Sequence, residues 1–391
     1  MVPLPFAKSE YLDRLKRLRA RMAERGIELL VVTDVANQNW LTAYDGWSFY
    51  TPQVVLVPIE DEEPLWIGRA MDAAGGKLTA WMDPSRVLGF PESYVQQTDR
   101  HPLDWIAAHV RERGWGKRRI GVETESYYYS PKAHARLQAG LPEATWLDGD
   151  LIVNWLRAVK SPAEIAYMRK AARLAEAAVR AAYDVIVPGL RECDAIARIV
   201  AAEVAGSPDF AGDITALPPT ILGGENATAP HIMWSDRRFG RDETVALELA
   251  GACRHYTAGL ARTLQLGKPA PKVLDVAEAV IEGMAAVVDF VRPGVTGEAV
   301  EGAWRKVIER DGLKKESRIG YAIGLAYPPD WGEHTISLRP GDKSVLEPGN
   351  TVHCILGMWM DGWGMEVSET ILVTQAGCEC LTSFPRDVHR K

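Results

Sequence analysis

The chain of 391 residues is 47% hydrophobic and 25% charged, proportions typical of a globular protein rather than a disordered, collagen-like or disulfide-stapled one. Its 45 Lys and Arg against 52 Asp and Glu give a net charge of -7 without any basic run, so we expect no nucleic-acid partner. No apolar stretch approaches the roughly 18 residues of a membrane span. The five cysteines are interpreted as reduced thiols, and we therefore expect a cytoplasmic protein with no membrane partner.

The first 158 residues alternate between helix and strand signals. Helices are predicted at residues 9–25, 101–113 and 131–139, and Gly26 closes the first of them. Strands are predicted at residues 28–32, 53–58, 64–68 and 119–123. Helices and strands interleaved at this spacing indicate an α/β domain. No G-x-G-x-x-G or P-loop pattern follows these strands, so nothing favours nucleotide binding.

A second domain is predicted to begin at residue 159. Ser161 and Glu164 form a capping-box pattern, and Pro162 occupies the first helical position. Apolar residues then recur every three or four positions as far as Ala182, which predicts a long helix. We therefore divide the chain into an N-terminal domain, residues 1–158, and a C-terminal catalytic domain, residues 159–391.

The second domain contains a faint internal repeat. A helix, a Pro-Gly break and a second helix occur around Pro188-Gly189 and again around Pro293-Gly294, about 105 residues later. Strands are predicted after the first copy at 214–222, 244–250 and 255–266, and after the second at 318–325, 351–360 and 366–374. Two helix pairs that each lead into antiparallel strands predict a pseudo-symmetric α+β domain with a cleft between its halves.

Five segments of the chain run in the order and spacing of one known family. They read LRAVKSPAEIAYMRKAARLAEAA, APHIMWSDRRF, ETVALELAGACRHYTAGLARTLQLG, LEPGNTVHCIL and VSETILVTQAG. The chain thereby resembles the pita-bread hydrolases, the family of methionine aminopeptidase, prolidase and creatinase. The resemblance implies an α+β, creatinase-like two-domain architecture: a C-terminal pita-bread domain with a pseudo-twofold repeat, and an N-terminal α/β domain similar to the smaller domain of prolidase and creatinase.

The family's metal ligands do not match this sequence. In the metallopeptidase members two Asp, one His and two Glu hold a pair of metal ions, and the matching positions here are Glu248, Gly259, Tyr321, Ile355 and Ser368. One carboxylate with these neighbours cannot offset the hydration that a divalent cation loses on binding. The resemblance thus implies a protein with no metal and no other cofactor.

Creatinase is a metal-free hydrolase of this fold, and the comparison with it is partial. Its two substrate-binding Glu positions fall on Ala261 and Ser368, so creatine is not expected as the substrate. Its general acid/base His falls on His231 in Ala-Pro-His. The run YAIGLAYPPDWGEHTISLRPGD, together with Glu248, resembles the ectoine hydrolases, which open the cyclic amidine ring of ectoine to an N-acetyl-diaminobutyrate.

The chemistry of an amidine assigns roles to Glu248 and His231. An amidinium is a poor electrophile, so hydrolysis needs a nucleophile against its central carbon and a proton for the departing nitrogen. Glu248 either attacks covalently, which we favour, or draws a proton from water, while His231 or else His334 transfers the proton. The competing interpretations are an ion pair of Glu248 with Arg262 or another Arg and a packing role for the histidines.

Further residues are expected to bind the substrate. Aromatic side chains suit a flat cation and exclude water, and Trp47, Tyr50, Tyr321 and Trp331 are the candidates. Glu333 and His334 lie in a predicted loop rich in Pro, Gly and Trp, where turn or capping roles compete with a role in the site. Strand alternation places Glu366, His353 and Gly357 on one face with Ser368 and Ile355, unless a bulge turns Glu369 inward instead.

The segment from Asn39 to Tyr50 holds five aromatic residues in a predicted loop, more ring area than a solvated loop should expose. Its match in creatinase-like relatives meets the other subunit's active site, so the resemblance implies a homodimer in which each N-terminal domain closes over its partner's cleft. Two other functions stay open: hydrolysis of another small amidino or guanidino zwitterion, and a non-catalytic pita-bread domain that binds peptides.

Overall fold

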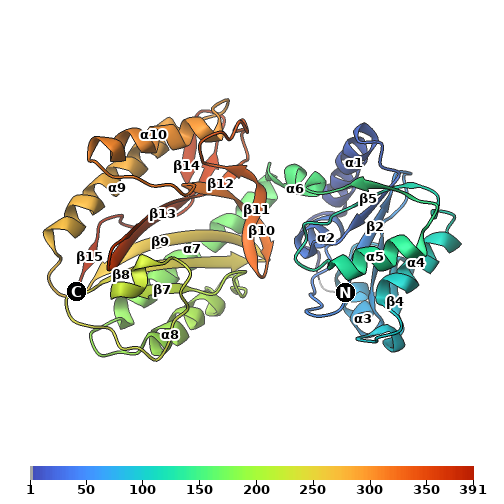
Figure 1. Cartoon of the computed structure of the whole chain (residues 1–391), viewed down its shortest axis with the longest axis horizontal. Coiled ribbons are helices and arrows are strands. Elements are labelled where there is room, and N and C mark those ends of the chain that lie inside the picture. The colour runs from blue at the N-terminus through green and yellow to red at the C-terminus, as the bar shows by residue number, and fades with distance from the viewer. Residues whose placement is uncertain (1–2) are drawn as a thin grey trace. The chain divides into compact units, whose positions relative to one another are not determined.

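A computed structural model describes residues 3–391 and divides the chain into two compact units, Met1–Arg157 and Ala158–Lys391 (Figure 1). The first unit holds a mixed sheet and the second an antiparallel sheet with paired helices, which confirms the predicted α+β, creatinase-like class. In the part of the chain described here, no helix is long and apolar enough to cross a membrane.

The N-terminal unit is built on a six-stranded sheet in the order β4-β3-β2-β1-β5-β6. Central strand β1 is buried along its whole length and pairs antiparallel with β2 and parallel with β5. The strands are β1 (Leu29–Val32), β2 (Val54–Pro58), β3 (Leu65–Arg69), β4 (Val87–Phe90), β5 (Arg119–Val122) and β6 (Thr145–Asp148). The helices are α1 (Lys8–Glu24), α2 (Val35–Thr42), α3 (Ala70–Thr79), α4 (Pro102–Glu112), α5 (Pro131–Gly140) and α6 (Ile152–Arg157).

The aromatic segment after β1 differs from its prediction. Its first residues, Asn39–Thr42, belong to helix α2, which Asp34 caps by accepting a hydrogen bond from the Asn37 N–H at 2.9 Å. Trp40 is only 1% exposed and lies under the guanidinium of Arg14, whose Cζ is 4.8 Å from the ring centroid. The predicted loop therefore begins after this helix, and Trp40 is a core residue.

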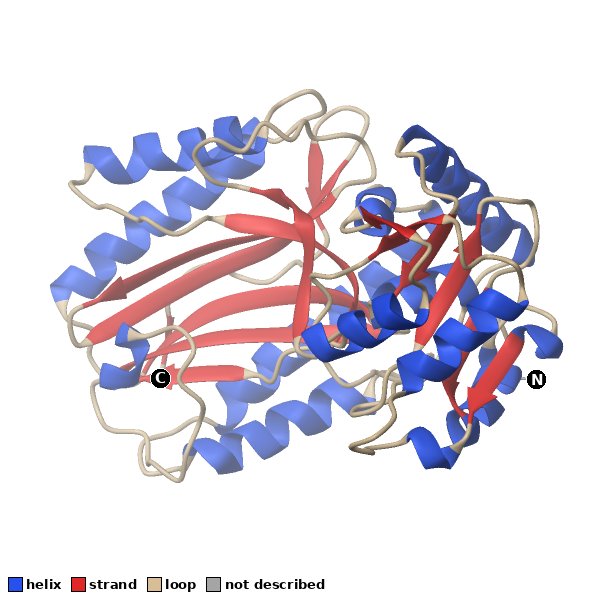
Figure 2. Cartoon of the chain, turned by 45° about the vertical axis from the view of Figure 1, so that its right-hand side comes forward, coloured by secondary structure: helices blue, strands red, loops and turns tan. Residues whose placement is uncertain are grey.

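The C-terminal unit is built on a mainly antiparallel sheet in the order β14-β13-β12-β10-β9-β8-β7 (Figure 2). Strand β11 pairs with β10, and β15 pairs parallel with β9. Its strands are β7 (Thr220–Gly223), β8 (Thr244–Cys253), β9 (Tyr256–Gln265), β10 (Gly320–Tyr327), β11 (Asp330–Ser337), β12 (Thr351–Met360), β13 (Trp363–Val373), β14 (Cys378–Cys380) and β15 (His389–Arg390). Its helices are α7 (Pro162–Val185), α8 (Glu192–Ala205), α9 (Pro271–Phe290) and α10 (Gly297–Arg310).

Two predicted segments of this unit are corrected by the structure. The strand expected at 214–222 starts only at Thr220, because Pro218 and Pro219 have no N–H to give to a ladder. The loop expected around Glu333 and His334 is strand β11, which forms a hairpin with β10. The Pro328-Pro329 pair before the strand, and the Gly and Trp within it, concealed the strand signal.

The two copies of the internal repeat share the same backbone conformation and equivalent hydrogen bonds at their Pro-Gly breaks. Gly189 and Gly294 both have a φ of +87°, a conformation that favours glycine, at the break between paired helices. The Gly189 N–H donates to Phe239 O at 2.8 Å, and the Gly294 N–H donates to Leu346 O at 2.9 Å. The two halves of the unit thus turn their chains in the same way.

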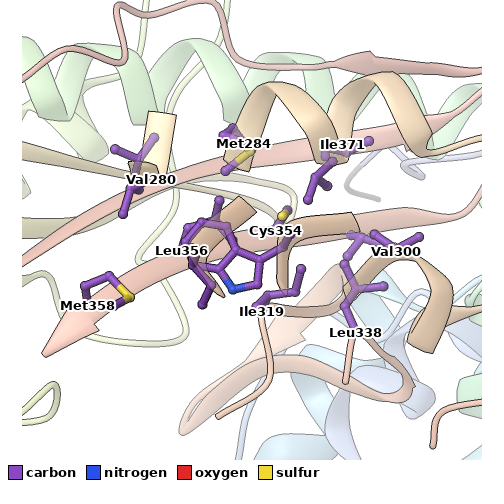
Figure 3. Packing of buried hydrophobic residues seen from close by; sticks show 14 of the residues in the cluster. Val280, Met284, Val300, Ile319, Leu338, Cys354, Leu356, Met358 and Ile371 are labelled. Atoms are coloured by element: carbon purple, nitrogen blue, oxygen red, sulfur yellow. The ribbon is translucent and has the colours of Figure 1, made fainter. Parts of the chain in front are cut away.

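One hydrophobic cluster fixes which face of β12 and β13 looks inward. Cys354, Leu356 and Met358 on β12, with Ile371 on β13, pack against Met284 and its neighbours on α9 and α10 (Figure 3). Side chains alternate along a strand, so the intervening residues point to the opposite face of the sheet. Those residues include His353, Ile355, Gly357, Glu366 and Ser368.

Candidate active site

Two carboxylates from different strands share the inner face of the sheet. Glu248 lies on β8 opposite Ala261 of β9, and its side chain is partly accessible to solvent. Glu366 lies on β13 and is 2% exposed. Thr263 Oγ1 accepts from the Glu366 N–H and donates to its carbonyl, both at 2.9 Å, so the main chain of Glu366 is fixed from β9.

Neither carboxylate has a cation bound to it. Among residues 3–391 no hydrogen bond or ion pair engages the Glu248 carboxylate, and Glu366 Oε2 is buried without a hydrogen-bond partner. Burial raises the pKa of Glu248 to about 7. Burial and the charge of Glu248 raise the pKa of Glu366 well above its usual range, against the opposing ammonium of Lys315. The pair therefore retains a proton near neutral pH.

The ion pair proposed as the alternative for Glu248 does not form. Arg262 is fully buried, and its Nη2 donates to Glu369 Oε1 at 2.7 Å. Its Nη1 donates to the carbonyl oxygens of Ala261 and Ser368 at 2.8 and 2.6 Å. The alternative register is also wrong, because β12 and β13 pair without a bulge from Thr351↔Leu372 to Met360↔Trp363, which leaves Glu369 on the outer face.

A chain of buried polar groups lies beside the carboxylates. His353 Nε2 is 2.8 Å from Ser368 Oγ, and its Nδ1 is 3.3 Å from the Tyr321 hydroxyl. Tyr321 also accepts a hydrogen bond from Trp331 Nε1 at 2.7 Å. Burial lowers the pKa of His353 to about 3, so the ring is neutral and links its neighbours instead of carrying a charge.

His353 is the residue whose importance sequence reasoning missed. Alternation with Ile355 placed it on the inner face, but no role followed from that placement. The structure shows a fully buried ring that joins Ser368 to Tyr321. The available signal was a histidine at an inward position of an otherwise apolar strand.

The five metal-ligand positions of the family do not fit a pair of divalent ions. A Cβ added at Gly259 would lie 2.7 Å from His353 Nε2, so the imidazole fills the space that a ligand at this position would use. Ser368 Oγ is already held by the Ala261 N–H at 2.6 Å and by His353. Over the described residues, no group of three or more His, Cys, Asp or Glu side chains is arranged to hold a metal ion.

Tyr321 and Trp331, two of the predicted aromatic residues, belong to this site. Trp331 is 2% exposed, and its ring meets the His353 ring edge-on at 5.7 Å. Burial and the charge of Glu248 raise the pKa of Tyr321. The phenol is linked through His353 and Ser368 to Ala261, the β9 residue paired with Glu248. The structure therefore brings Glu248, Glu366, Tyr321 and Trp331 together.

Glu333 and His334 have partners of their own on β11. Glu333 is 1% exposed, and its Oε2 accepts from Lys160 Nζ at 2.5 Å. His334 is exposed and has Nε2 2.8 Å from Asp330 Oδ2. Although burial opposes it, hydrogen bonds from His334 and the Gly332 N–H hold the pKa of Asp330 below its usual range. Sequence reasoning did not single out Asp330.

Three predicted residues, His231, Trp47 and Tyr50, lie on other segments of the chain. His231 is exposed on the segment after the short helix η3 (Gly224–Thr228). Trp47 and Tyr50 lie in the N-terminal unit, where the Trp47 ring contacts Phe49 at 4.4 Å and the Tyr50 hydroxyl is bonded to Arg69. The roles given to these residues stay predictions.

Comparisons with known proteins cover both units. Residues 166–375 match the metallopeptidase family M24, and residues 14–159 match the creatinase/prolidase N-terminal domain. An ectoine hydrolase of Halomonas elongata is 42% identical over 100% of this chain and 99% of its own length. An uncharacterized hydrolase/peptidase of Sinorhizobium fredii is 40% identical over 98% of both chains.

Solved structures agree with the fold. A prolidase from Thermococcus sibiricus superposes with a TM-score of 0.82 at 18% identity, over 97% of this chain and 99% of the prolidase. At this level of identity the likeness concerns the fold alone.

Proposed function

Because the chain belongs to metallopeptidase family M24 and has a creatinase/prolidase N-terminal domain, we propose that this hydrolase opens the cyclic amidine ring of ectoine. The product is an N-acetyl-diaminobutyrate, and hydroxyectoine is a second proposed substrate. The full-length identity of 42% to an ectoine hydrolase supports this choice of substrate. The second support is the chemistry of the site itself.

One observation carries the proposal: Glu248 and Glu366 face one site, and no cation among the described residues is bound to either carboxylate. Two carboxylates close together repel each other unless a proton or a cation lies between them. A flat amidinium supplies a delocalised positive charge and two N–H donors. Tyr321 and Trp331 offer ring surface beside it and keep water away from the ion pair.

In the proposed reaction Glu248 supplies the oxygen or activates the water that supplies it. In the first route the ionised carboxylate attacks the amidinium carbon, a C–O bond forms, and one ring C–N bond breaks as the departing nitrogen takes up a proton. Water then hydrolyses the imidoyl ester, which releases the N-acetyl product and regenerates the Glu248 carboxylate. In the second route Glu248 removes a proton from water, whose oxygen attacks the same carbon. The pKa of about 7 leaves roughly half of Glu248 ionised near neutral pH for either route.

The departing nitrogen needs a proton, and two groups compete to deliver it. Glu366 keeps a proton near neutral pH because its pKa is raised, and it is close enough for Glu248 to contribute to that rise. His231 is the proton carrier suggested by the resemblance to creatinase, and His334 is the alternative. We therefore propose Glu366 as a further candidate for the general acid, beside His231 and His334.

We propose that the reaction needs no metal. The five family positions supply one carboxylate, and His353 fills the space at Gly259. Every step above is consequently assigned to side chains of the protein.

Incubation with ectoine, followed by NMR of the ring protons and of the released acetyl product, tests the proposal. Ring opening that depends on enzyme concentration is the expected result. Turnover of another amidino or guanidino zwitterion without turnover of ectoine would move the protein to that substrate class. Absence of turnover across such a panel, with binding of peptides, would favour the non-catalytic alternative.

We also propose a homodimer in which each N-terminal domain closes over its partner's site. Phe49 and Tyr50 are 69% and 58% exposed, and large exposed rings of this kind are typical of interfaces. Light scattering should give twice 43.1 kDa, and Trp47→Ala should raise KM more than it lowers the melting temperature. A fully active monomer would contradict the shared site.

A further inference from the structure

Arg318 lies two residues before β10, at the edge of the site. Its Cζ is 4.2 Å from the centroid of the Tyr321 ring, so the guanidinium rests on the same phenol that meets Trp331 and His353. The residue is exposed, and within residues 3–391 its guanidinium makes no hydrogen bond or ion pair. Its N–H donors are therefore available to a ligand.

The charge of Arg318 reaches several groups of the site. It contributes to the pKa of Tyr321, Asp330 and His353, lowering each of them. Asp330 is a neighbouring carboxylate, but it is hydrogen-bonded to His334 Nε2 and to the Gly332 N–H, both at 2.8 Å. The guanidinium thus contacts an aromatic ring but has no anionic partner among the described residues.

The order of charges across the site matches a zwitterion. The negative charge of Glu248 acts on Tyr321, and the guanidinium of Arg318 lies 4.2 Å from the centroid of the same ring, so charges of both signs meet at this side chain. An amidinium placed against the carboxylates would direct a carboxylate on the same small ring toward the guanidinium. Arg is the side chain best shaped to grip a carboxylate, through two parallel N–H donors.

We propose that Arg318 binds the carboxylate of the substrate and so makes the enzyme specific for amidines that also carry an acid. The assignment rests on the proposed function, because it requires a zwitterion in the site. Tyr321 acts as the platform that positions the guanidinium. Cyclic amidines without a carboxylate should still bind to Glu248 and Glu366 but should lack the contact with Arg318.

The test compares two substrates in matched variants. The substrates are ectoine and 2-methyl-1,4,5,6-tetrahydropyrimidine, which is the same ring without the carboxylate. Arg318→Gln removes the charge and Arg318→Lys keeps it. Arg292→Gln is the control, since Arg292 is also exposed and lies over an aromatic ring, Phe290, at 5.2 Å but away from the site.

A charged hydrogen-bond pair of this kind corresponds to roughly a 10- to 100-fold change in binding. We expect Arg318→Gln to lower kcat/KM for ectoine by that factor, mainly through KM, and to leave kcat/KM for the acid-free ring within about twofold. Arg318→Lys should recover part of the loss, and Arg292→Gln should behave as the wild type.

Three outcomes would overturn the assignment. Equal losses on both substrates would make Arg318 a support for Tyr321 rather than a carboxylate ligand. No loss on either substrate would remove it from the site. Both results would leave the proposed function intact, because the wild type would still hydrolyse ectoine, whereas a wild type that neither binds nor opens ectoine would overturn the proposed function and this assignment together.

Discussion

Strand β13 has two glutamates, three residues apart, on opposite faces, and the protein treats them in opposite ways. On the outer face Glu369 receives Arg262 Nη2 at 2.7 Å and Arg386 Nε at 2.9 Å, and the Thr382 hydroxyl also donates to it. On the inner face Glu366 has a buried oxygen that no donor in the described chain reaches. Both side chains are at most 2% exposed, so burial alone does not separate them.

The difference teaches how to tell a structural carboxylate from a functional one. A buried charge costs several kcal/mol unless it is paired, and a scaffold glutamate such as Glu369 is paired within the chain. Glu366 and Glu248 lack such pairing, and the raised pKa of each records the cost. Under the proposed function, the amidinium of the substrate offsets this cost.

The largest expected effect concerns the inner face. Glu248→Gln should lower kcat by more than about 1,000-fold, because the amide copies the shape of the carboxylate but acts neither as nucleophile nor as base. Ring opening followed by NMR measures the loss, and circular dichroism confirms the fold. Glu225→Gln, the same change at an exposed glutamate, is the control. Retention of more than a tenth of kcat would show that Glu248 is not the catalytic carboxylate.

A substitution of Glu369 on the outer face should lower the stability of the protein and leave its activity nearly unchanged. Glu369→Gln leaves the guanidinium of Arg262 buried without its counter-charge, and we expect the free energy of unfolding to fall by about 3 kcal/mol. Urea denaturation measures this, and kcat per folded molecule should stay within about threefold of the wild type. A variant as stable as the wild type would show that Glu369 is not a stabilising partner of Arg262.

Glu366→Gln tests whether the second inner carboxylate acts as an acid. Because burial and the charge of Glu248 raise its pKa well above the usual range, its protonated form is favoured, and glutamine resembles that form without a proton to give. We expect kcat to fall about 100-fold. The acid limb of kcat/KM, set near pH 7 by Glu248, should keep its position. Unchanged kcat would return proton transfer to His231 or His334.

The raised pKa of Glu248 also predicts how stability changes with pH. The folded-state value of about 7 lies above the ordinary 4.5, so the folded state binds more protons than the unfolded state between these values. Its stabilising contribution is full below pH 4.5 and is lost as the pH rises through 7. Relative to the wild type, Glu248→Gln should gain about 2 kcal/mol in the free energy of unfolding between pH 5 and pH 8. Urea denaturation at each pH measures this free energy. The same pH dependence in the variant and the wild type would contradict the prediction.

The smallest expected effect is that of a chelator. Because the inner face offers one carboxylate at the five family ligand positions, prolonged dialysis against EDTA should leave kcat unchanged. Elemental analysis of the purified protein should find no stoichiometric Mn, Co, Fe or Zn. Loss of activity that added metal restores would overturn the metal-free proposal.

Much of this arrangement could be predicted from the sequence, because it follows from periodicity. The paired Pro-Gly breaks marked the repeat, and strand alternation from Ser368 correctly placed Glu366 on the inner face. Strand β11 was missed because its Gly and Trp, and the two Pro just before it, suggest a loop. Helix α2 was missed because its eight residues are buried on all sides and show no apolar period. Short edge strands such as β4 and β6 bury too little to show a pattern.

Partners of buried charges could not be predicted. Glu333 pairs with Lys160, 173 residues away, and Arg262 pairs with Glu369, 107 residues away. Nothing local in the sequence encodes such pairings, since they depend on how the sheet curves and which strands meet. The same reason hid His353, whose role depends on Ser368 and Tyr321 from two other strands.

The imidazole of His353, lodged beside Gly259, also constrains evolution. Any side chain introduced at Gly259 would place its Cβ 2.7 Å from His353 Nε2, so an aspartate at this position requires the imidazole to move or to be replaced. Replacing His353 first would break its contacts to Ser368 and Tyr321 before any new activity is gained. The residues at positions 259 and 353 are therefore coupled, and a side chain at Gly259 requires a compensating change at His353.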